Sequence, residues 1–522
     1  MKLLLLTIAS AFALNTYSQA PTIQWQNLIV GNNVDAVNKT IQSTDGNFYS
    51  VGSTLSTAGN LSNYQGGWDS WISKIDVNGN FVWKKPIGGS NTDYLTDIIQ
   101  TNDGNYLASG TSYSSDGDLL SIPYSTTPKN IWLIKFNDTG ILWEQRYGGS
   151  GDGGFSTNSH LIEATNGDLH VFANTVSNDG DIINSHSNGM NENDIVYFKL
   201  SSNGTILSQK NYGGSDDDNF YSASLTSDGG IAILGRSRST DFDVSQHLAS
   251  SGNYDTWIFK IDNALNIVWD KSFLTSSYLG TTCIKELSNG KIMFSSTISN
   301  NFVDATLNLL SANGNLIWQK NYGGSYIDRI DDFIEINPNR ILCSGYTYSN
   351  DGDVTNNTLG DGIWLVDVDS LGVINNQNMY GGSMPESGAK LTKTIDNQFV
   401  LSGGTSSIDH DVVNPYTWNC FCEEAWIFKL NMNTVGIQEN QLTNTFSIYP
   451  NPTREFFKMQ LPPDVKPQFI EVYGIQGQMV MRQTTRLVGD SLEINVSELN
   501  AGIYMVRVLA GNKVYVARLL KQ

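Results

Sequence analysis

The chain has 522 residues, a net charge of −20 and a charged fraction of only 16%. This length exceeds one ordinary domain, and so few charges exclude a highly charged disordered chain and a coiled coil. The acidic balance argues against nucleic acid as a partner, because phosphate backbones attract Lys and Arg. Four Cys are too few for a disulfide framework.

The N-terminus has the pattern of a secretory signal peptide. Lys2 precedes a mostly apolar run from Leu3 to Leu14, and polar residues follow it. Such a run is too short to cross a membrane and is typical of a cleaved leader. We predict that residues 1–20 are a signal peptide and that the mature chain contains no transmembrane segment.

A repeat fills residues 21–434. Its clearest marker is Tyr-Gly-Gly-Ser, which occurs at Tyr147–Ser150, Tyr212–Ser215, Tyr322–Ser325 and Tyr380–Ser383, with a variant at Ile87–Ser90. Each unit has the pattern of four short strands, and its Asp-Gly and Asn-Gly pairs suit two-residue hairpins. A period of this size indicates a propeller or a solenoid.

The order of the strands favours a closed ring. A copy of strand four occurs at Ile23–Ile29, before any strand one, and none follows the last strand three at Trp426–Leu430. The N-terminal strand should therefore complete the last blade and protect its edge. We predict an all-β, seven-bladed β-propeller with four-stranded blades; the alternative, an open solenoid, leaves the displaced strand unexplained.

The composition changes after the last repeat. Residues 435–445 are polar and linker-like, and residues 446–522 contain alternating strands. Alternation of this kind predicts a small antiparallel, immunoglobulin-like β-sandwich.

This second module carries an ordered set of motifs. They are Ser447-Ile-Tyr-Pro450-Asn451-Pro452, then Val472-Tyr-Gly-Ile-Gln-Gly477, then Leu499-Asn-Ala-Gly502-Ile-Tyr504. The set resembles the type A C-terminal sorting domain of the type IX secretion system, and an ordinary adhesive sandwich is the alternative. The motif positions are occupied by Pro450, Asn451, Pro452, Gly477, Gly502 and Tyr504.

That resemblance implies a Bacteroidota origin and a route of export. The chain would reach the periplasm by its Sec signal peptide and cross the outer membrane through the type IX secretion machinery, its one implied partner. It would then lie outside the cell or on the outer-membrane surface. The propeller resembles uncharacterised repeats found with such sorting domains, and this resemblance implies no activity.

Acidic residues recur at three positions of the repeat. Asp-Gly-Asp copies between strands two and three place Asp116 with Asp118, Asp179 with Asp181, and Asp351 with Asp353. A second row follows the Gly-Gly pair (Asp35, Asp93, Asp218, Asp328, Glu386), and a third precedes strand three (Asp69, Asp194, Asp255, Asp304, Glu424). Antiparallel strands alternate in direction, so all three rows should lie on one face of the ring.

Two roles are open for these residues. Asp-x-Asp pairs offer hard oxygen ligands, so we predict a Ca²⁺ site at the six Asp of the first row. The alternative is turn capping, in which Asp bonds its own backbone. The unit around Phe294–Asp304 lacks the Gly-Gly and Asp-Gly-Asp copies, and we expect no site there.

No catalytic motif is visible. The five His show no nucleophile–base or metal spacing, and Cys420-x-Cys422 allows either a local disulfide or a metal pair. The sequence favours a secreted, non-enzymatic binding or adhesion propeller whose glycan or protein ligand it does not name. The alternative is a secreted enzyme, a glycoside hydrolase or quinone-dependent oxidoreductase, with its site on the acidic loop face; a structural surface-layer component is a third.

Overall fold

The structure is a computed structural model of the chain. It describes residues 21–61, 64–119, 130–149, 159–186, 192–250, 252–275, 280–299, 302–355, 357, 359–413, 422–432, 447–460, 469–474, 479–484, 492–510 and 513–522. Two compact units result, one formed by Ala20–Met432 and one that includes Asn433–Gln522. In the part of the chain described, no helix is long and apolar enough to cross a membrane.

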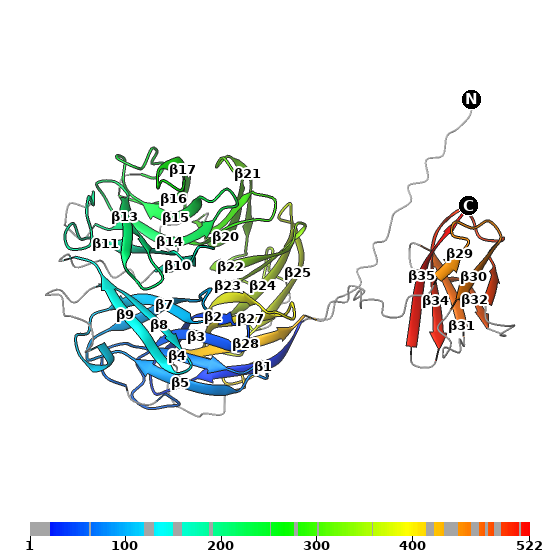
Figure 1. The fold of residues 1–522 in the computed structure, drawn as a ribbon, viewed down its shortest axis with the longest axis horizontal. Coiled ribbons are helices and arrows are strands. Elements are labelled where there is room, and N and C mark those ends of the chain that lie inside the picture. Colours follow the sequence, from blue (N-terminus) through cyan, green and yellow to red (C-terminus); the bar gives the residue numbers. More distant parts are fainter. Residues whose placement is uncertain are drawn as a thin grey trace. The chain divides into compact units, whose positions relative to one another are not determined.

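The first unit consists of seven four-stranded antiparallel sheets, which we call blades 1 to 7 (Figure 1). Blade 1 contains β2 (Asp35–Gln42), β3 (Phe48–Thr54), β4 (Asp69–Ile75) and β5 (Phe81–Ile87). Blade 2 contains β6 (Asp93–Gln100), β7 (Tyr106–Ser112), β8 (Asn130–Asn137) and β9 (Gly140–Tyr147), with the short 3₁₀ helix η1 (Gly117–Leu119). Blade 3 contains β10 (His160–Glu163), β11 (Leu169–Thr175), β12 (Asp194–Leu200) and β13 (Ile206–Tyr212).

The remaining blades repeat this order. Blade 4 contains β14 (Asp218–Leu225), β15 (Ile231–Ser237), β16 (Asp255–Ile261) and β17 (Ile267–Leu274). Blade 5 contains β18 (Thr281–Glu286), β19 (Ile292–Ser299), β20 (Val303–Leu310) and β21 (Leu316–Tyr322). Blade 6 contains β22 (Asp328–Asn337), β23 (Arg340–Thr347), β24 (Gly362–Asp369) and β25 (Ile374–Tyr380).

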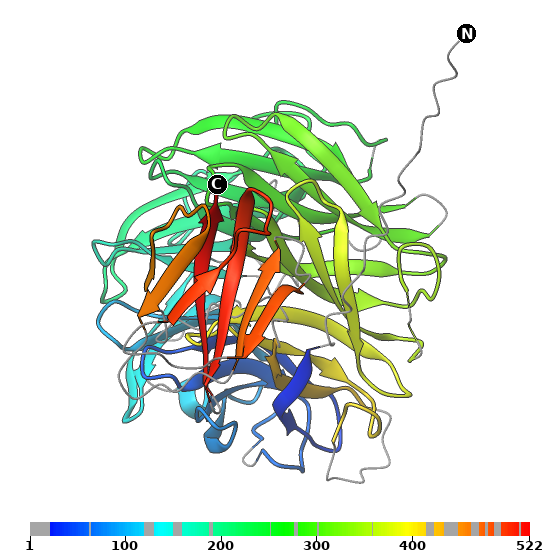
Figure 2. The same cartoon turned by 90° about the vertical axis from the view of Figure 1, so that its right-hand side faces the viewer.

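Blade 7 joins the two ends of the propeller. It contains β26 (Glu386–Lys393), β27 (Phe399–Thr405), β28 (Glu424–Asn431) and, as its outer strand, β1 (Thr22–Ile29). Ile23 pairs with Leu430 and Leu28 with Trp426 in an antiparallel register, and the views place the blue β1 beside the gold β28 (Figures 1 and 2). This confirms the seven-bladed propeller and its closure by the N-terminal strand.

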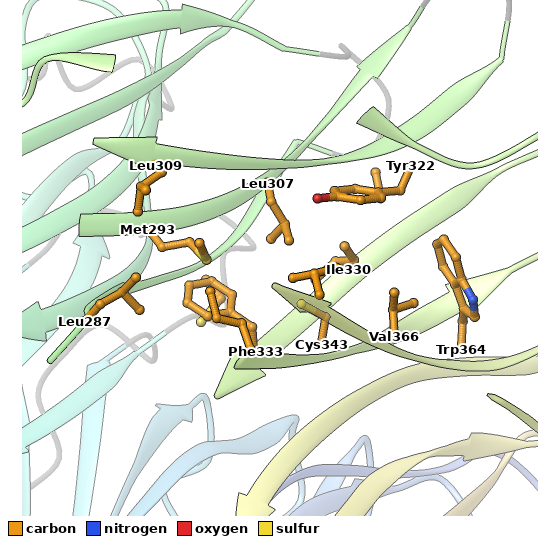
Figure 3. Close-up of a cluster of buried hydrophobic side chains, with 14 of the residues drawn as sticks. Leu287, Met293, Leu307, Leu309, Tyr322, Ile330, Phe333, Cys343, Trp364 and Val366 are labelled. Atoms are coloured by element: carbon orange, nitrogen blue, oxygen red, sulfur yellow. The ribbon is translucent and has the colours of Figure 1, made fainter. Parts of the chain in front are cut away.

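The hydrophobic core lies between neighbouring blades. Between blades 5 and 6, Met293 and Leu307 pack with Phe333, Cys343 and Trp364 in one buried cluster (Figure 3). The strand-three Trp is fully buried at the same position of five blades: Trp71, Trp132, Trp257, Trp364 and Trp426. Large aromatic side chains bury much apolar area each, so this row stabilises the stack of blades.

A polar contact also links three blades, those that end in Tyr147, Tyr212 and Tyr322, to the next blade. The Tyr before Gly-Gly donates its hydroxyl proton to the hairpin that joins the two outer strands of the following blade. Tyr147 bonds the Gly204 carbonyl at 2.5 Å, and Tyr322 bonds the Gly372 carbonyl at 2.7 Å. The repeated Tyr therefore fixes the distance between consecutive blades at their outer edge.

The second unit is a sandwich of two sheets (orange to red in Figure 2). One sheet contains β29 (Ser447–Tyr449), β30 (Phe456–Gln460) and β33 (Leu492–Asn495). The other contains β31 (Phe469–Gly474), β32 (Met479–Thr484), β34 (Gly502–Ala510) and β35 (Lys513–Lys521). Phe457, Ile494, Val472 and Val506 share its buried core, so the unit has a core of its own.

The motif residues of this unit hold its sheets together. Asn451 donates its side-chain amide to the Arg518 carbonyl at 2.6 Å and accepts from the Leu520 backbone N–H at 2.8 Å. Tyr504 donates its hydroxyl to the Asn500 carbonyl at 2.8 Å. Pro450 and Pro452 follow cis peptide bonds, Gly502 begins β34, and Gly477 lies outside the described residues.

Candidate functional site: the loop face and the central channel

The acidic rows meet at the Gly-Gly-Ser loops that connect one blade to the next. Around the loop Gly88–Ser90, Asp93 accepts a hydrogen bond from the second Gly N–H at 2.8 Å. Asp116 accepts from the Ser N–H at 2.7 Å, and Asp118 is 3.4 Å from the first Gly nitrogen. Three carboxylates from separate sequence positions therefore hold one loop by its backbone.

The same arrangement recurs in other blades. We call the face of the ring that carries the Gly-Gly-Ser loops the loop face. Backbone N–H groups of the Gly-Gly-Ser loops are bonded in blade 4 by Asp218, Asp241 and Asp243, and in blade 7 by Glu386, Asp409 and Asp411. Gly fits this loop because a Cβ at either Gly would press on the carboxylates; at Gly88 it would lie 2.7 Å from Asp69 Oδ1. The Gly-Gly-Ser loops thus supply the donors, and the acidic rows the acceptors, of one set of hydrogen bonds.

The six predicted calcium residues take part in these contacts. Asp351 accepts from the Ser325 N–H at 2.7 Å, and the backbone N–H of Asp353 bonds the Gly323 carbonyl at 2.8 Å. Asp181 accepts from the Gly148 N–H at 3.1 Å, and Asp179 lies in the same turn as Asp181. Gly148 belongs to the loop that follows β9 of the preceding blade 2. Each pair belongs to a different blade, and no three His, Cys, Asp or Glu of the described residues gather closely enough to hold a metal. Calcium at these Asp remains a prediction.

Turn capping takes a form that the sequence did not reveal. The capping Asp bonds the backbone of a loop about 26 positions away, as Asp116 does with Ser90, rather than only its own turn. The hydrogen bond from the Ser90 backbone lowers the pKa of Asp116, so this carboxylate is held in its charged form.

The second row is buried and behaves in the opposite way. Asp218 and Glu386 are at most 1% exposed, and burial raises the pKa of each to about 7. Burial also raises the pKa of Asp69 to about 6, and its Oδ1 has no hydrogen-bond partner among the described residues. In the coupled pair Asp35 and Glu424, burial and mutual repulsion raise the pKa of Glu424, so this pair retains a proton.

A channel runs through the ring and is lined by the first strand of every blade. Its wider part has a volume of about 460 Å³ and is bordered by residues of β2, β6, β10, β14, β18, β22 and β26. A second cavity of about 350 Å³ borders the loop-face ends of β2, β14, β18, β22 and β26 and shares Asn38, Tyr221, Thr282 and Lys390 with the first. The two cavities therefore follow one another along the channel, and we call the second one the channel mouth.

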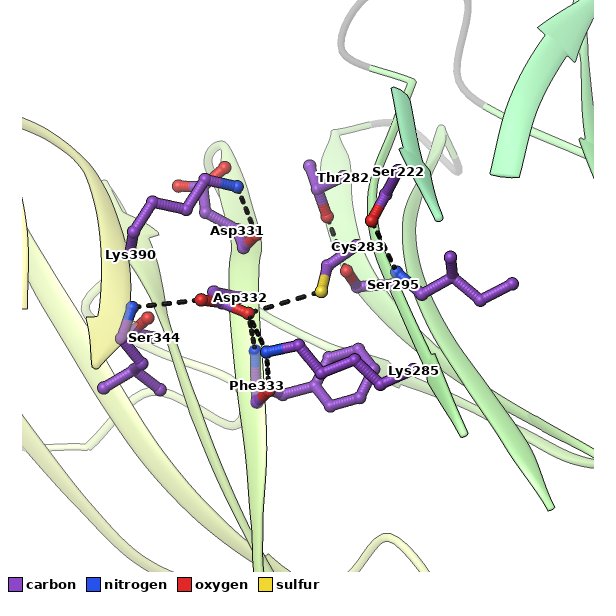
Figure 4. A network of polar contacts seen from close by, with 12 residues as sticks. Ser222, Thr282, Cys283, Lys285, Ser295, Asp331, Asp332, Phe333, Ser344 and Lys390 are labelled. Carbon is purple, nitrogen blue, oxygen red and sulfur yellow. Dashed lines mark hydrogen bonds and ion pairs between the residues drawn. The ribbon is translucent and has the colours of Figure 1, made fainter. Parts of the chain in front are cut away.

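Buried ion pairs hold the inner strands together in the channel wall. Lys285 Nζ of β18 lies 2.6 Å from Asp332 Oδ1 of β22, and Cys283 Sγ donates to the same oxygen at 3.3 Å (Figure 4). The other oxygen of Asp332 accepts from the Leu391 N–H of β26 at 3.1 Å. Burial alone would raise the pKa of Asp332, but Lys285 and Lys390 hold it below its usual range.

Asp97 does the same between blades 1, 2 and 3. It forms ion pairs with Lys39 and with His160, whose Nδ1 is 3.1 Å away, and accepts from the Leu161 N–H at 2.8 Å. Despite its burial, Lys39 and His160 lower the pKa of Asp97. Asp97 and Asp332 are therefore charged and fully bonded, which suits wall residues better than catalytic acids or bases.

The Cys residues take no part in metal binding in the described chain. Cys283 and Cys343 are buried free thiols, and burial raises the pKa of the Cys283 thiol to about 12. Cys422 is disulfide-bonded, while Cys420 lies outside the described residues.

Arginines lie in or beside the channel mouth: Arg329 of blade 6 lines it, and Arg236 of blade 4 contacts Tyr221, which also lines it. The propeller segment 21–434 has only five Arg, and three of them are Arg236, Arg238 and Arg329. The Arg236 guanidinium lies 5.2 Å from the ring centre of Tyr221 and 4.4 Å from that of Tyr254. Arg238 lies 4.9 Å from the same Tyr254 ring, so the two guanidinium groups share one aromatic side chain.

Sequence reasoning did not find this cluster. One signal was present: at the end of strand two, blade 4 has Arg-Ser-Arg (236–238), where blade 6 has Tyr-Thr-Tyr (346–348) and blade 1 has Ser-Thr-Leu (53–55). The charged residues stand next to the degenerate blade 5, where we expected no site. A comparison of repeat positions for out-of-pattern Arg, rather than for shared Asp, could have shown it.

Comparison with known proteins identifies the second unit. Residues 447–522 match the family described as the secretion system C-terminal sorting domain. The C-terminal module is a secretion-system sorting domain. The resemblance seen in the motifs is thereby confirmed, and a sorting domain indicates secretion to the outside of the cell or its surface.

The propeller is similar to distantly related solved structures. A protein of unknown function from Bacteroides caccae is 12% identical, with 61% of this chain and 92% of that chain covered and a TM-score of 0.33. An ulvan lyase of polysaccharide lyase family PL25, bound to -[GlcA(1-4)Rha3S]-, is 12% identical, with 73% and 93% covered and a TM-score of 0.44. The periplasmic gluconolactonase of Pseudomonas aeruginosa is 9% identical, with 66% and 85% covered and a TM-score of 0.40.

These likenesses concern the fold and carry no argument about activity. The neighbours include enzymes and a protein of unknown function, so they do not separate a binding propeller from an enzyme. A search of curated proteins finds no sequence that matches this chain.

Proposed function

We propose that the chain is a non-enzymatic binding or adhesion protein of a Bacteroidota cell, exported through the type IX secretion machinery, whose ligand site is the channel mouth. The sorting domain supports the export, and the apolar run of residues 1–20 supports entry by a Sec signal peptide. The observation that carries the binding site is a channel lined by all seven blades, whose mouth is bordered by Arg329 and by Tyr221, the ring that Arg236 contacts. Aromatic and Arg side chains are the groups that most often dominate binding surfaces.

The carboxylates of the mouth favour binding over acid–base catalysis. Asp331 is paired with Arg329 at 2.6 Å, and Glu423 is bonded by the Ser387 hydroxyl. A general acid and base need two carboxylates in contrasting environments that both reach the substrate. Deeper in the channel, Asp97 and Asp332 are already bonded on both oxygens. The alternative, a glycoside hydrolase or quinone-dependent oxidoreductase on the loop face, would have to use carboxylates such as Asp93 and Asp116, which bond the backbone of the Gly-Gly-Ser loops.

A binding array tests the proposal. The purified chain is applied to immobilised glycans and extracellular proteins, and each positive ligand is then incubated with the chain and analysed for cleaved or oxidised products. We expect a ligand that binds and is recovered unchanged. Product formation would replace the proposal by the enzyme alternative, and the absence of any ligand on both arrays would contradict a binding role.

A further inference from the structure

The side chain of Arg236 is the starting point, because no carboxylate of the described residues pairs with it. Of the three arginines in or beside the mouth, Arg238 has an Nη2 3.0 Å from Asp216, and Arg329 has its Nε 2.6 Å from Asp331. Arg236 has no ion pair or hydrogen bond from its guanidinium to any described residue, and its Nε is buried. Among the described residues, this half-buried guanidinium therefore has no carboxylate partner.

Asp217, a carboxylate beside Tyr254, is already hydrogen-bonded within the protein. Asp217 accepts hydrogen bonds from the Tyr254 hydroxyl, from the backbone and side-chain N–H groups of Asn193, and from the Asn219 amide. These donors fix the Tyr254 ring in place. The Arg236 guanidinium lies over this fixed ring, so the ring and the guanidinium are held in place before a ligand binds.

The neighbouring blade leaves room for Arg236. Gly280, just before β18, has a φ of +66°, and a Cβ there would lie 2.9 Å from Arg236 Cδ. A side chain at position 280 would therefore displace the arginine. Blade 5 also has only three residues (300–302) between its second and third strands, whereas blade 1 has fourteen (55–68) and blade 4 has seventeen (238–254).

A guanidinium stacked on aromatic rings keeps its N–H groups in the ring-parallel plane, where they suit a planar or tetrahedral oxyanion. We propose that Arg236 binds the carboxylate or sulfate group of a ligand beside the channel mouth, an assignment that rests on the proposed function. Arg238 shares the Tyr254 ring with Arg236, and Tyr221, which Arg236 contacts, lines the cavity that Arg329 borders. The anion would replace the missing carboxylate partner of Arg236.

Calorimetric titration of the purified full chain tests this assignment at constant ionic strength. The probes are sodium glucuronate against glucose, which differ by the carboxylate, and sodium sulfate against sodium chloride. We expect binding of glucuronate or sulfate and none of glucose or chloride. Which of the two anions binds decides between a carboxylate and a sulfate ligand. Equal heats from glucose and glucuronate together with no heat from sulfate would overturn the proposal.

Substitutions locate the anion. Arg236→Met should weaken binding of the active probe at least tenfold, and Arg236→Lys should retain part of it, because Lys keeps the charge but not the two-pronged geometry. Arg340→Met is the matched control: Arg340 is bonded to Asp367 at 2.6 Å, begins β23 at the opposite end from the loop face, and should leave binding unchanged. Unchanged affinity in Arg236→Met would overturn the assignment.

Further measurements decide the cases that these variants leave open. If Arg236→Met does not fold, the Lys variant and the salt dependence of binding by the unmodified chain decide, since a charge-based site weakens as salt rises. A ligand on the array whose binding is neutral and insensitive to Arg236 would leave the proposed function intact and remove the anion site. Anion binding at Arg236 together with two negative arrays would support the anion site and contradict the proposed function.

Discussion

The hydroxyl of Tyr380 donates a hydrogen bond of 2.8 Å to the carbonyl oxygen of Pro21, 359 positions earlier in the chain. At the same repeat position, Tyr147 and Tyr322 bond the outer hairpin of the next blade. In blade 7 this hairpin does not exist, because the outer strand comes from the N-terminus. Tyr380 therefore makes at the junction of the ring the same contact that its counterparts make within it.

Removal of residues 21–30 should lower the melting temperature sharply. The deletion takes away β1, exposes the edge of β28 and uncovers the buried Trp426. An unpaired central edge also invites association between chains. Thermal unfolding followed by circular dichroism, with light scattering for association, measures both effects. A truncated chain that melts like the full chain would mean that β1 is not needed to close the ring.

The Tyr380→Phe substitution should cost about 0.5–1.5 kcal/mol of unfolding free energy, the usual net value of one hydrogen bond. Tyr147→Phe, which removes the 2.5 Å bond to Gly204, is its matched counterpart inside the ring. We expect similar losses for the two variants in denaturant titrations. A much larger loss at Tyr147 would show that the junction between first and last blade is looser than the others.

Loss of residues 446–522 should abolish export but not folding. The propeller's last strand ends at Asn431, and the sorting domain has a separate core, so a chain ending near Thr434 keeps every blade. We expect this truncated chain to fold when produced in the cytoplasm and to remain in the periplasm of the native host. Fractionation and surface proteolysis follow it; normal appearance on the surface would contradict the role of the module.

The sequence was sufficient for the fold because the repeat signal is redundant. Gly-Gly pairs, turn residues and strand-three Trp mark the same period, and the displaced strand at Ile23–Ile29 indicates how the ring closes. The bulges of the inner strands were not predictable. The register shifts between Leu95 and Asp97, and again between Ile330 and Asp332, without any Gly or Pro to mark the change. These bulges decide which side chains line the channel.

The candidate site was only partly predictable for a related reason. The acidic rows were visible as a pattern, but their hydrogen-bond partners are backbone N–H groups, which every residue has and no sequence pattern reveals. The Arg cluster stands where blade 4 departs from the repeat, next to the degenerate blade 5, and depends on the contacts of Arg236 and Arg238 with tyrosine rings. Such a site breaks the repeat, so a search for shared positions passes over it.

Millimolar Ca²⁺ should raise the melting temperature of the chain, and a chelator should reverse the rise. Asp69 Oδ1 is buried without a hydrogen bond to a described residue and lies beside Asp93, and a cation would relieve the repulsion between such carboxylates. An affinity of about 10⁻⁴–10⁻³ M is typical of extracellular calcium modules.

The variant Asp351→Ala with Asp353→Ala should show a smaller calcium response than the unmodified chain, and sodium chloride of equal ionic strength should not reproduce it. Calorimetry measures the binding heat alongside the melt. If calcium gives neither heat nor a shift, the acidic residues of the loop face serve only to hold the Gly-Gly-Ser loops.

The stability of the propeller should fall as the pH rises from 5 to 8. The pKa of Asp218 and of Glu386 is about 7 in the folded chain, against about 4 in an unfolded one. The folded state therefore binds more protons between these values, and its stabilisation, complete below pH 4, is lost as the pH passes through 7. His170, whose pKa burial lowers, works in the opposite direction but is one group against several.

Asp218→Asn should flatten this dependence in melts recorded at pH 5, 6, 7 and 8. The Asn oxygen can still accept from the Gly214 N–H and the Ser239 hydroxyl, which Asp218 bonds now at 2.6 and 2.8 Å. Asp116→Asn is the control, since the pKa of Asp116 is lowered and its titration lies below this range. A melting temperature that rises towards pH 8 would show that ionisation of buried carboxylates such as Asp218 does not destabilise the folded chain.

A ring closed by its first strand also imposes a schedule on biosynthesis. β1 leaves the ribosome at the start, but its partner β28 follows only after about 400 more residues, which is about 20–80 s at ordinary rates of synthesis. Throughout that time the outer strand of blade 7 has no sheet to join, and blades 1 to 6 can assemble only as an open arc. Completion of the propeller therefore comes shortly before residues 447–522 are synthesised, so the ring closes at about the time when the sorting domain appears.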